Sequence, residues 1–289
     1  MTHDLARLGL GTVQFGQAYG ISNTHGQVSP EAARTTLDRA AHAGLKTLDT
    51  AAAYGNAEAV LGGLPDATRP FRIVTKTISL KNGLDAVVAR ARQSVATLGR
   101  RPVDLLLVHS AGDLSLPDGP DLWKTLLALR DEGLFGGIGI SAYVADDPAA
   151  LARKFRPAAM QVPVSLFDQR LIKSGALAAM KDMGVEIHAR SLFLQGLLFL
   201  PENKIPTKLA SVAPHLKNLR ATFANAGTTP LAAAIAFALG RPEIDVAVVG
   251  VTTVSEFDEI VAAARQPTPS IDWASCALND EIVLTPSLW

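Results

Sequence analysis

Short apolar runs alternate with amphipathic segments along almost the whole chain. Eight of these runs span only four to seven residues and are nearly continuous in hydrophobic character, which is typical of strands buried on both faces. We expect strands at residues 8–12, 46–49, 71–76, 103–109, 137–141, 158–163, 185–190 and 246–249.

The segments between these runs have the spacing of amphipathic helices. We expect helices at residues 30–42, 56–64, 84–98, 122–132, 148–155, 171–183, 230–239 and 255–264. Ser29 followed by Pro30 marks the start of one of them, because serine caps helices and proline is favoured in the first turn. Eight strand–helix units are the number that closes a (β/α)8 TIM barrel, so we expect a single domain over residues 1–289. Doubly wound sheets have fewer strands.

Two segments do not fit the repeat. Residues 191–229, after the seventh strand, are too long for an ordinary connection, and such loops form functional lids or carry extra helices. The tail after Ala264 is rich in proline and contains Trp273 and Trp289. We expect this tail to fold over the mouth of the barrel.

Four polar side chains lie where strands end. Asp49, Lys76 and His109 each close an apolar run, and Tyr54 lies in the loop that follows Asp49. Because the carboxyl ends of all barrel strands open onto one face, these side chains can converge there. Their chemistry suggests proton transfer by Tyr54, with Lys76 favouring its ionised form and Asp49 holding Lys76.

Composition narrows the class of protein. The 27 Lys and Arg residues balance 27 Asp and Glu residues, so there is no basic surplus to attract nucleic acid or an anionic membrane. No apolar run is long enough to span a bilayer, and no signal-like start is visible. The single cysteine, Cys276, excludes an intramolecular disulfide and a multi-thiolate metal site, and no histidine pair has metal-ligand spacing. We expect a soluble cytoplasmic enzyme without a metal.

Several motifs together resemble the aldo-keto reductase family over nearly the whole chain. They are LGLGTVQFG, LDTAAAYGNAEAVLG, IVTKT, LLLVHS, GISAY, QVPVSLFDQR and QGLL, in this order. The resemblance implies a (β/α)8 barrel and reversible, NAD(P)H-dependent reduction of an aldehyde, ketone or sugar carbonyl to an alcohol. It also implies that Tyr54 donates the proton, that Lys76 and Asp49 tune it, and that His109 orients the carbonyl oxygen.

The resemblance also implies a set of cofactor contacts after strands five to eight. These are Ser141, Gln161, Arg190, Ser191, Gly250, Thr252 and Thr253.

Four positions depart from the family pattern around that cofactor. Ala142 replaces an asparagine, Arg190 replaces an aromatic residue, and Thr252 and Glu256 stand where cationic or amide side chains are common. The resemblance favours NADP(H). A carboxylate beside a 2′-phosphate would repel it, so NAD(H) is also possible.

Two other functions remain as alternatives. One is an aldolase-type barrel in which Lys76 forms an imine; the order of Asp49, Tyr54, Lys76 and His109 argues against it, and borohydride trapping would decide. The other is a non-catalytic regulatory subunit that senses the cofactor. The complete set of four residues argues for turnover, which a cofactor-oxidation assay would test.

The substrate is expected to be a small carbonyl compound. The segment GTVQFGQAYGISNTHGQVS resembles bacterial members that act in sugar and polysaccharide chemistry, which implies a sugar-like carbonyl. The residues expected to wall the pocket are Phe15, Tyr19, Phe193, Leu194 and Trp289. Two further polar residues are expected to be structural: Glu58 in a helix cap or salt bridge, and His188 in packing.

Overall fold

Eight parallel strands close a barrel in the computed structural model, which describes residues 3–289. The strands are β1 (Leu8–Gly11), β2 (Thr47–Asp49), β3 (Arg72–Lys76), β4 (Val103–Val108), β5 (Phe135–Ser141), β6 (Ala159–Pro163), β7 (Glu186–Arg190) and β8 (Val246–Gly250). Each strand pairs with its sequence neighbours, and β8 returns to β1 with Val249 opposite Leu10. The expected (β/α)8 fold is confirmed.

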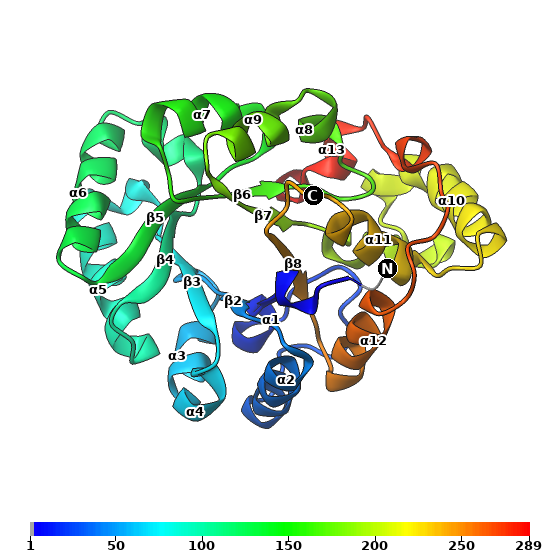
Figure 1. Cartoon of the computed structure of the whole chain (residues 1–289). Helices are drawn as coiled ribbons and strands as arrows, with labels where there is room; N and C mark the ends of the chain where they lie inside the picture. Colours follow the sequence, from blue (N-terminus) through cyan, green and yellow to red (C-terminus); the bar gives the residue numbers. More distant parts are fainter. Residues whose placement is uncertain (1–2) are drawn as a thin grey trace.

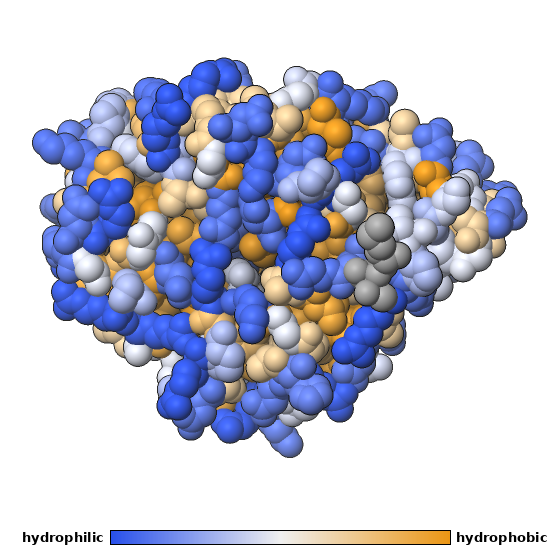
Figure 2. Space-filling model, viewed as in Figure 1, coloured by the Kyte–Doolittle hydropathy of each residue, from blue (hydrophilic) through white to orange (hydrophobic). Residues whose placement is uncertain are grey.

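Helices form a ring around this barrel (Figure 1). The helices that connect successive strands are α2 (Pro30–Ala43), α3 (Ala57–Gly62), α5 (Leu84–Leu98), α6 (Gly119–Asp131), α7 (Pro148–Phe155), α9 (Ala176–Asp182) and α11 (Pro230–Leu239), and α12 (Val254–Ala264) follows β8. The hydroxyl of Ser29 caps α2 by accepting a hydrogen bond from the amide of Ala32. On the face seen in Figure 2, hydrophilic residues dominate the outer surface, with hydrophobic residues visible between them.

The helix expected at residues 171–183 is wrong in one respect, because the chain forms two helices there. These are α8 (Arg170–Lys173) and α9, and Gly175 between them has φ 73°. A left-handed residue interrupts the hydrogen-bonding pattern of a helix, and glycine adopts that conformation without a steric penalty. The apolar spacing continues through the break and so does not reveal it.

The middle of the barrel is filled by side chains that point inward from alternate strand positions. Val74, Leu105, Leu107 and Ala159 form a buried apolar cluster separate from the main core between barrel and helices. Gly139 makes room for this cluster: a Cβ there would lie 2.5 Å from both a Leu107 methyl group and the carbonyl oxygen of Ala159. The interior below the mouth is therefore packed rather than open.

A charged cluster lies at the amino-terminal ends of the strands. Arg72 donates two hydrogen bonds to Glu186, at 2.9 and 3.1 Å, and His188 Nε2 lies 3.0 Å from the same carboxylate. Burial would raise the pKa of Glu186, but the hydrogen bonds with His188 and Arg72 outweigh it and lower that pKa to about 2. His188 is fully buried, as expected of a packing residue.

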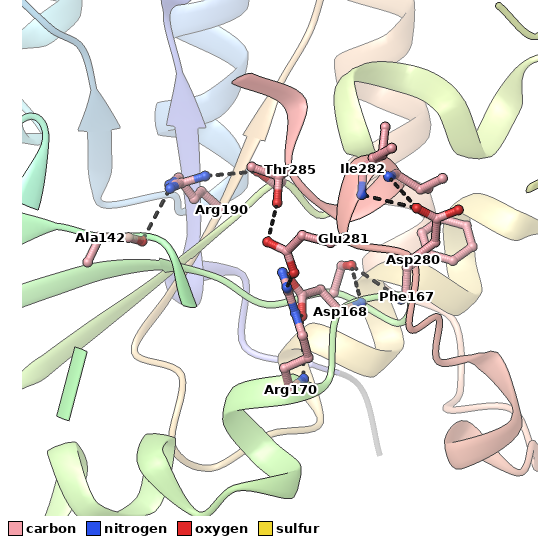
Figure 3. A network of polar contacts seen from close by, with 12 residues as sticks. Ala142, Phe167, Asp168, Arg170, Arg190, Asp280, Glu281, Ile282 and Thr285 are labelled. Carbon is pink, nitrogen blue, oxygen red and sulfur yellow. Dashed lines mark hydrogen bonds and ion pairs between the residues drawn. The ribbon is translucent and has the colours of Figure 1, made fainter. Parts of the chain in front are cut away.

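The insertion after β7 contains an additional helix, α10 (Ala213–Asn225), beside α11 (Figure 1). The carboxyl-terminal tail forms α13 (Glu281–Leu284), and Arg170 ties it to the barrel (Figure 3). Arg170 binds Asp168 at 2.7 and 2.8 Å and also pairs with Glu281. This anchor brings the end of the tail, at Pro286, to the cavity described below.

Taken singly, none of the helices formed by residues 3–289 is both long and apolar enough to cross a membrane. The segments Thr207–Asn225 and Pro230–Leu239 meet that length and composition only together, across a bend of 85°.

A buried carboxylate connects the helix layer to the strand that carries Lys76. Glu58 in α3 is 3% exposed and accepts hydrogen bonds from Thr75 of β3 (2.6 Å), Arg90 of α5 (2.6 Å) and Ser94 (3.1 Å). The salt bridge expected for Glu58 is therefore present, but its partner comes from a different helix.

We expect Glu58→Ala to lower the free energy of unfolding by about 3 kcal/mol. The reason is that the partly buried Arg90 and the hydroxyl groups of Thr75 and Ser94 lose the carboxylate that they bind. Urea unfolding followed by circular dichroism measures this loss. Asp66→Ala, which breaks the exposed pair between Asp66 and Arg69, is the matched control and should hardly move the midpoint. Equal midpoints for the two variants would contradict a stabilising role for Glu58.

Candidate active site

A buried ion pair lies at the carboxyl ends of β2 and β3. The ammonium of Lys76 is 2.6 Å from Asp49 Oδ1 and donates a second hydrogen bond, of 2.9 Å, to the carbonyl of Thr50. Lys76 is 1% exposed and Asp49 4%. Burial alone would lower the pKa of Lys76, but the negative charge of Asp49 reverses this, and the pKa lies above its ordinary value.

The other oxygen of Asp49 binds a third strand. Gln161 of β6 donates a hydrogen bond of 2.6 Å from Nε2 to Asp49 Oδ2. Both carboxylate oxygens of Asp49 therefore have charged or polar donors, which is the condition for burying such a charge without a large penalty.

Tyr54 and His109 lie beside this pair. The ring of Tyr54 is 5.0 Å from Lys76 Nζ, measured to the ring centroid. The Tyr54 and His109 rings meet edge to face, with centroids 5.8 Å apart and planes 80° apart. The four side chains predicted from the sequence thus come together at one end of the barrel.

The loop that carries Tyr54 is held by close backbone contacts. A Cβ on Gly16, in α1 (Val13–Gly16), would lie 1.8 Å from the carbonyl oxygen of Tyr54. A Cβ on Gly55 would lie 2.2 Å from the carbonyl oxygen of Gly16, and Gly55 has φ 54°. Only glycine fits at these two positions, so the turn after β1 fixes the backbone of Tyr54.

The imidazole of His109 is neutral at ordinary pH. Burial disfavours its charged form and the Lys76 ammonium repels it, which together lower the pKa of His109 to about 4. A neutral imidazole keeps one N–H donor, and His109 lines the cavity above the ion pair.

A cavity of about 1190 Å³ opens above these residues. Asp49, Tyr54 and His109 line it, whereas Lys76 lies beneath. Among the residues expected to contact a cofactor, those that line the cavity are Ser141, Gln161, Arg190, Ser191, Gly250 and Thr252. Thr253 instead caps α12, with its hydroxyl accepting a hydrogen bond from the amide of Glu256 at 3.1 Å.

The far end of the cavity lies at the loop after β8. Glu256 there accepts hydrogen bonds from the amide and hydroxyl of Thr252, at 2.6 and 2.9 Å. A carboxylate thus already occupies the donors of this turn. Beside it, Gln14 packs against Gly250, where a Cβ would lie 2.8 Å from the amide group. The Gln14 Oε1 atom is buried without a hydrogen-bond partner among residues 3–289.

The walls of the cavity differ in part from expectation. Tyr19 and Phe193 line it as predicted. The prediction that Phe15, Leu194 and Trp289 line the cavity is wrong. Phe15 and Leu194 are buried in the main core, and Trp289 donates its indole N–H to the carbonyl of Ile282.

Sequence reasoning missed Gln14 and Tyr143 as lining residues. Gln14 follows the GLGT motif closely, but nothing in a single sequence distinguishes it from a solvated loop residue.

Within residues 3–289, no group of three or more His, Cys, Asp or Glu side chains is placed to hold a metal ion.

Several known proteins are similar to this chain in sequence or in fold. The chain is 32% identical over 143 residues to an aldo-keto reductase of Mycolicibacterium smegmatis, and 27% identical over 172 residues to a glyoxal reductase of Bacillus subtilis. These alignments cover 47% and 58% of the chain and only 50% and 59% of the two relatives. An aldo-keto reductase of Bacillus halodurans, solved in its holo form, superposes with a TM-score of 0.73 at 19% identity, covering 91% of this chain and 87% of that one.

The family comparison spans far more of the sequence than these pairwise alignments. The model of the aldo/keto reductase family matches residues 7–278. The chain belongs to the aldo-keto reductase family.

Proposed function

We propose that the protein reduces an aldehyde, ketone or sugar carbonyl to an alcohol with NAD(P)H, with Tyr54 as the proton donor. The observation that carries this proposal is the buried Lys76–Asp49 pair directly beside the ring of Tyr54, which His109 also contacts edge to face. Reduction builds negative charge on the carbonyl oxygen, and a donor placed where that charge develops lowers the barrier. The balanced charge and single cysteine favour a cytoplasmic location.

Each of the four residues has a separate task. Tyr54 gives its phenolic proton to the carbonyl oxygen, and the Lys76 ammonium stabilises the phenolate that remains. Asp49 holds Lys76 in place and balances its charge. His109 is neutral, because its pKa is about 4, and its N–H can orient the carbonyl oxygen without adding a positive charge.

The cavity has the residues that a nicotinamide cofactor would need. Ser141 and Gln161 would hold the carboxamide, while Ser191, Gly250 and Thr252 would contact the remainder. The buried Gln14 Oε1, which has no hydrogen-bond partner among residues 3–289, supports a polar ligand at this end. When bound, the cofactor supplies the hydride, and the protein supplies position and charge.

The imine-forming alternative fits the geometry poorly. Lys76 is 1% exposed, does not line the cavity and has two protein acceptors for its ammonium. A Schiff-base lysine has to reach its substrate as a free amine, which this pairing opposes.

We expect Tyr54→Phe to bind cofactor and fold normally while losing about 100- to 10,000-fold in kcat/KM, since a positioned general acid contributes about that much. Glyoxal is a suitable first substrate because one relative is a glyoxal reductase. Tyr19→Phe, which removes another phenol from the same cavity, should cost far less. Reduction by Tyr54→Phe at the wild-type rate would show that Tyr54 is not the donor.

Lys76→Met should abolish most activity and move the alkaline limb of the residual pH–rate profile to higher pH. The reason is that the ammonium favours the ionised form of Tyr54, so its loss keeps the phenol protonated to higher pH. Lys76→Arg keeps the charge and should leave the limb closer to its wild-type position. Identical profiles for Lys76→Met and the wild type would refute this tuning role.

For the cofactor, we propose binding of NADPH with modest discrimination and useful activity with NADH. A 2′-phosphate at the β8 loop would meet the Glu256 carboxylate, which already holds the donors of Thr252. The loss of one charged arginine contact could remove about 10- to 150-fold of NADP preference. Fluorescence titration with both reduced cofactors measures this, and Glu256→Gln should increase the preference for NADPH. A wild-type preference above about a thousandfold would be incompatible with this view.

A further inference from the structure

Arg190, the last residue of β7, places a guanidinium in the catalytic cavity with only neutral partners. Its Nη2 donates to the carbonyl of Ala142 at 3.2 Å (Figure 3). Its Nη1 donates to Ser191 Oγ at 3.3 Å. The guanidinium carbon lies 4.2 Å from the centre of the Tyr143 ring. Both hydrogen bonds are long, and no other acceptor among residues 3–289 binds the remaining N–H groups.

Other partly buried arginines of the barrel have strong partners. Arg90 and Arg170 each bind a carboxylate within 3 Å, and Arg7 donates hydrogen bonds to three backbone carbonyl groups. Arg190 makes no ion pair with any carboxylate of residues 3–289, although its side chain is half-buried. A partly desolvated, unpaired cation is costly, so its retention at the wall of a cavity points to a ligand that completes it.

The charges around Arg190 favour an anion at this end of the cavity. Asp49, a buried carboxylate that lines the same cavity, is neutralised by Lys76 and hydrogen-bonded by Gln161, and His109 is uncharged at neutral pH. Arg190 itself contributes to the low pKa of His109, so its charge is felt at the catalytic residues. Lys204 also lines the cavity and forms no ion pair with residues 3–289.

We propose that Arg190 binds a carboxylate of the substrate, so that the preferred substrate is a carbonyl compound that also carries a carboxylate group. The planar guanidinium presents paired donors that match a carboxylate in a fixed geometry. Stacking on Tyr143 holds the plane of the guanidinium and limits the entropy lost on binding. This inference rests on the proposed carbonyl reduction, since it names the substrate class for the same site.

The kinetic experiment compares carboxylate substrates with their methyl esters, which retain the carbonyl and the electron-withdrawing group but lose the charge. Suitable pairs of increasing length are glyoxylate, 4-oxobutanoate and 4-formylbenzoate with their esters. We expect Arg190→Gln to lower kcat/KM for the best acid about 10- to 150-fold more than for its ester, the range of a charged hydrogen bond. Arg190→Lys should give a kcat/KM for the acid between those of the wild type and Arg190→Gln. Arg69→Gln, a change at an exposed arginine, should alter kcat/KM for neither the acid nor the ester.

Equal losses for acid and ester in every pair would overturn the inference, because Arg190 would then serve the cofactor or the fold. A wild-type preference for all three esters would overturn it as well. Thermal melts of the Arg190 variants establish that each one folds.

A binding measurement separates this inference from the proposed reaction. Calorimetric titration of the protein with 4-(hydroxymethyl)benzoate and with its methyl ester needs no turnover. We expect the carboxylate to bind at least about tenfold more weakly to Arg190→Gln than to the wild type, with a smaller change for the ester. Absence of carbonyl reduction with a positive binding result would refute the reaction but retain the anion site; no difference in binding would refute the anion site.

Discussion

The ion pair between Lys76 and Asp49 constrains the whole mouth of the barrel. An ammonium at 1% exposure is tolerable only with a carboxylate and a further acceptor beside it, here Asp49 and the carbonyl of Thr50. Asp49 belongs to β2 and Lys76 to β3, and Gln161 of β6 completes the second oxygen from across the barrel. Because β2 and β6 are not neighbours in the sheet, the contact between Asp49 and Gln161 requires the closed barrel, and the full set of partners of Asp49 assembles only there.

Below this pair the barrel is divided by polarity. Leu105 and Leu107 fill its middle, and Gly139 leaves space for the second of them. The Arg72–Glu186 pair lies at the opposite end. This apolar layer separates the two charged clusters, so the environment of Tyr54 depends on the residues of the mouth and hardly on those at the other end.

Arg190, Thr252 and Glu256, which depart from the pattern of the resemblance, line the cavity, whereas the residues proposed for proton transfer keep that pattern. Near the catalytic end, Arg190 replaces an aromatic side chain and brings a positive charge without a paired carboxylate. At the far end, Glu256 brings a negative charge to the turn after β8. A fold of this kind supports different specificities by changing the loops at its mouth. From the charge of Arg190 we infer the class of substrate, and from the charge of Glu256 we infer the cofactor preference.

The order of apolar runs determined the eight-stranded barrel, because buried parallel strands and their helices have distinct lengths and periodicities. The same pattern predicted that Asp49, Lys76 and His109 lie at one end of the barrel. It could not predict the break at Gly175 or the burial of Phe15, since local apolar spacing is the same in either case. Only the tertiary structure decided that the guanidinium of Arg190 has no carboxylate partner among residues 3–289. It also decided that the Glu256 carboxylate accepts hydrogen bonds from Thr252. Whether a charged group is paired depends on contacts between distant segments, and a single sequence does not encode those distances.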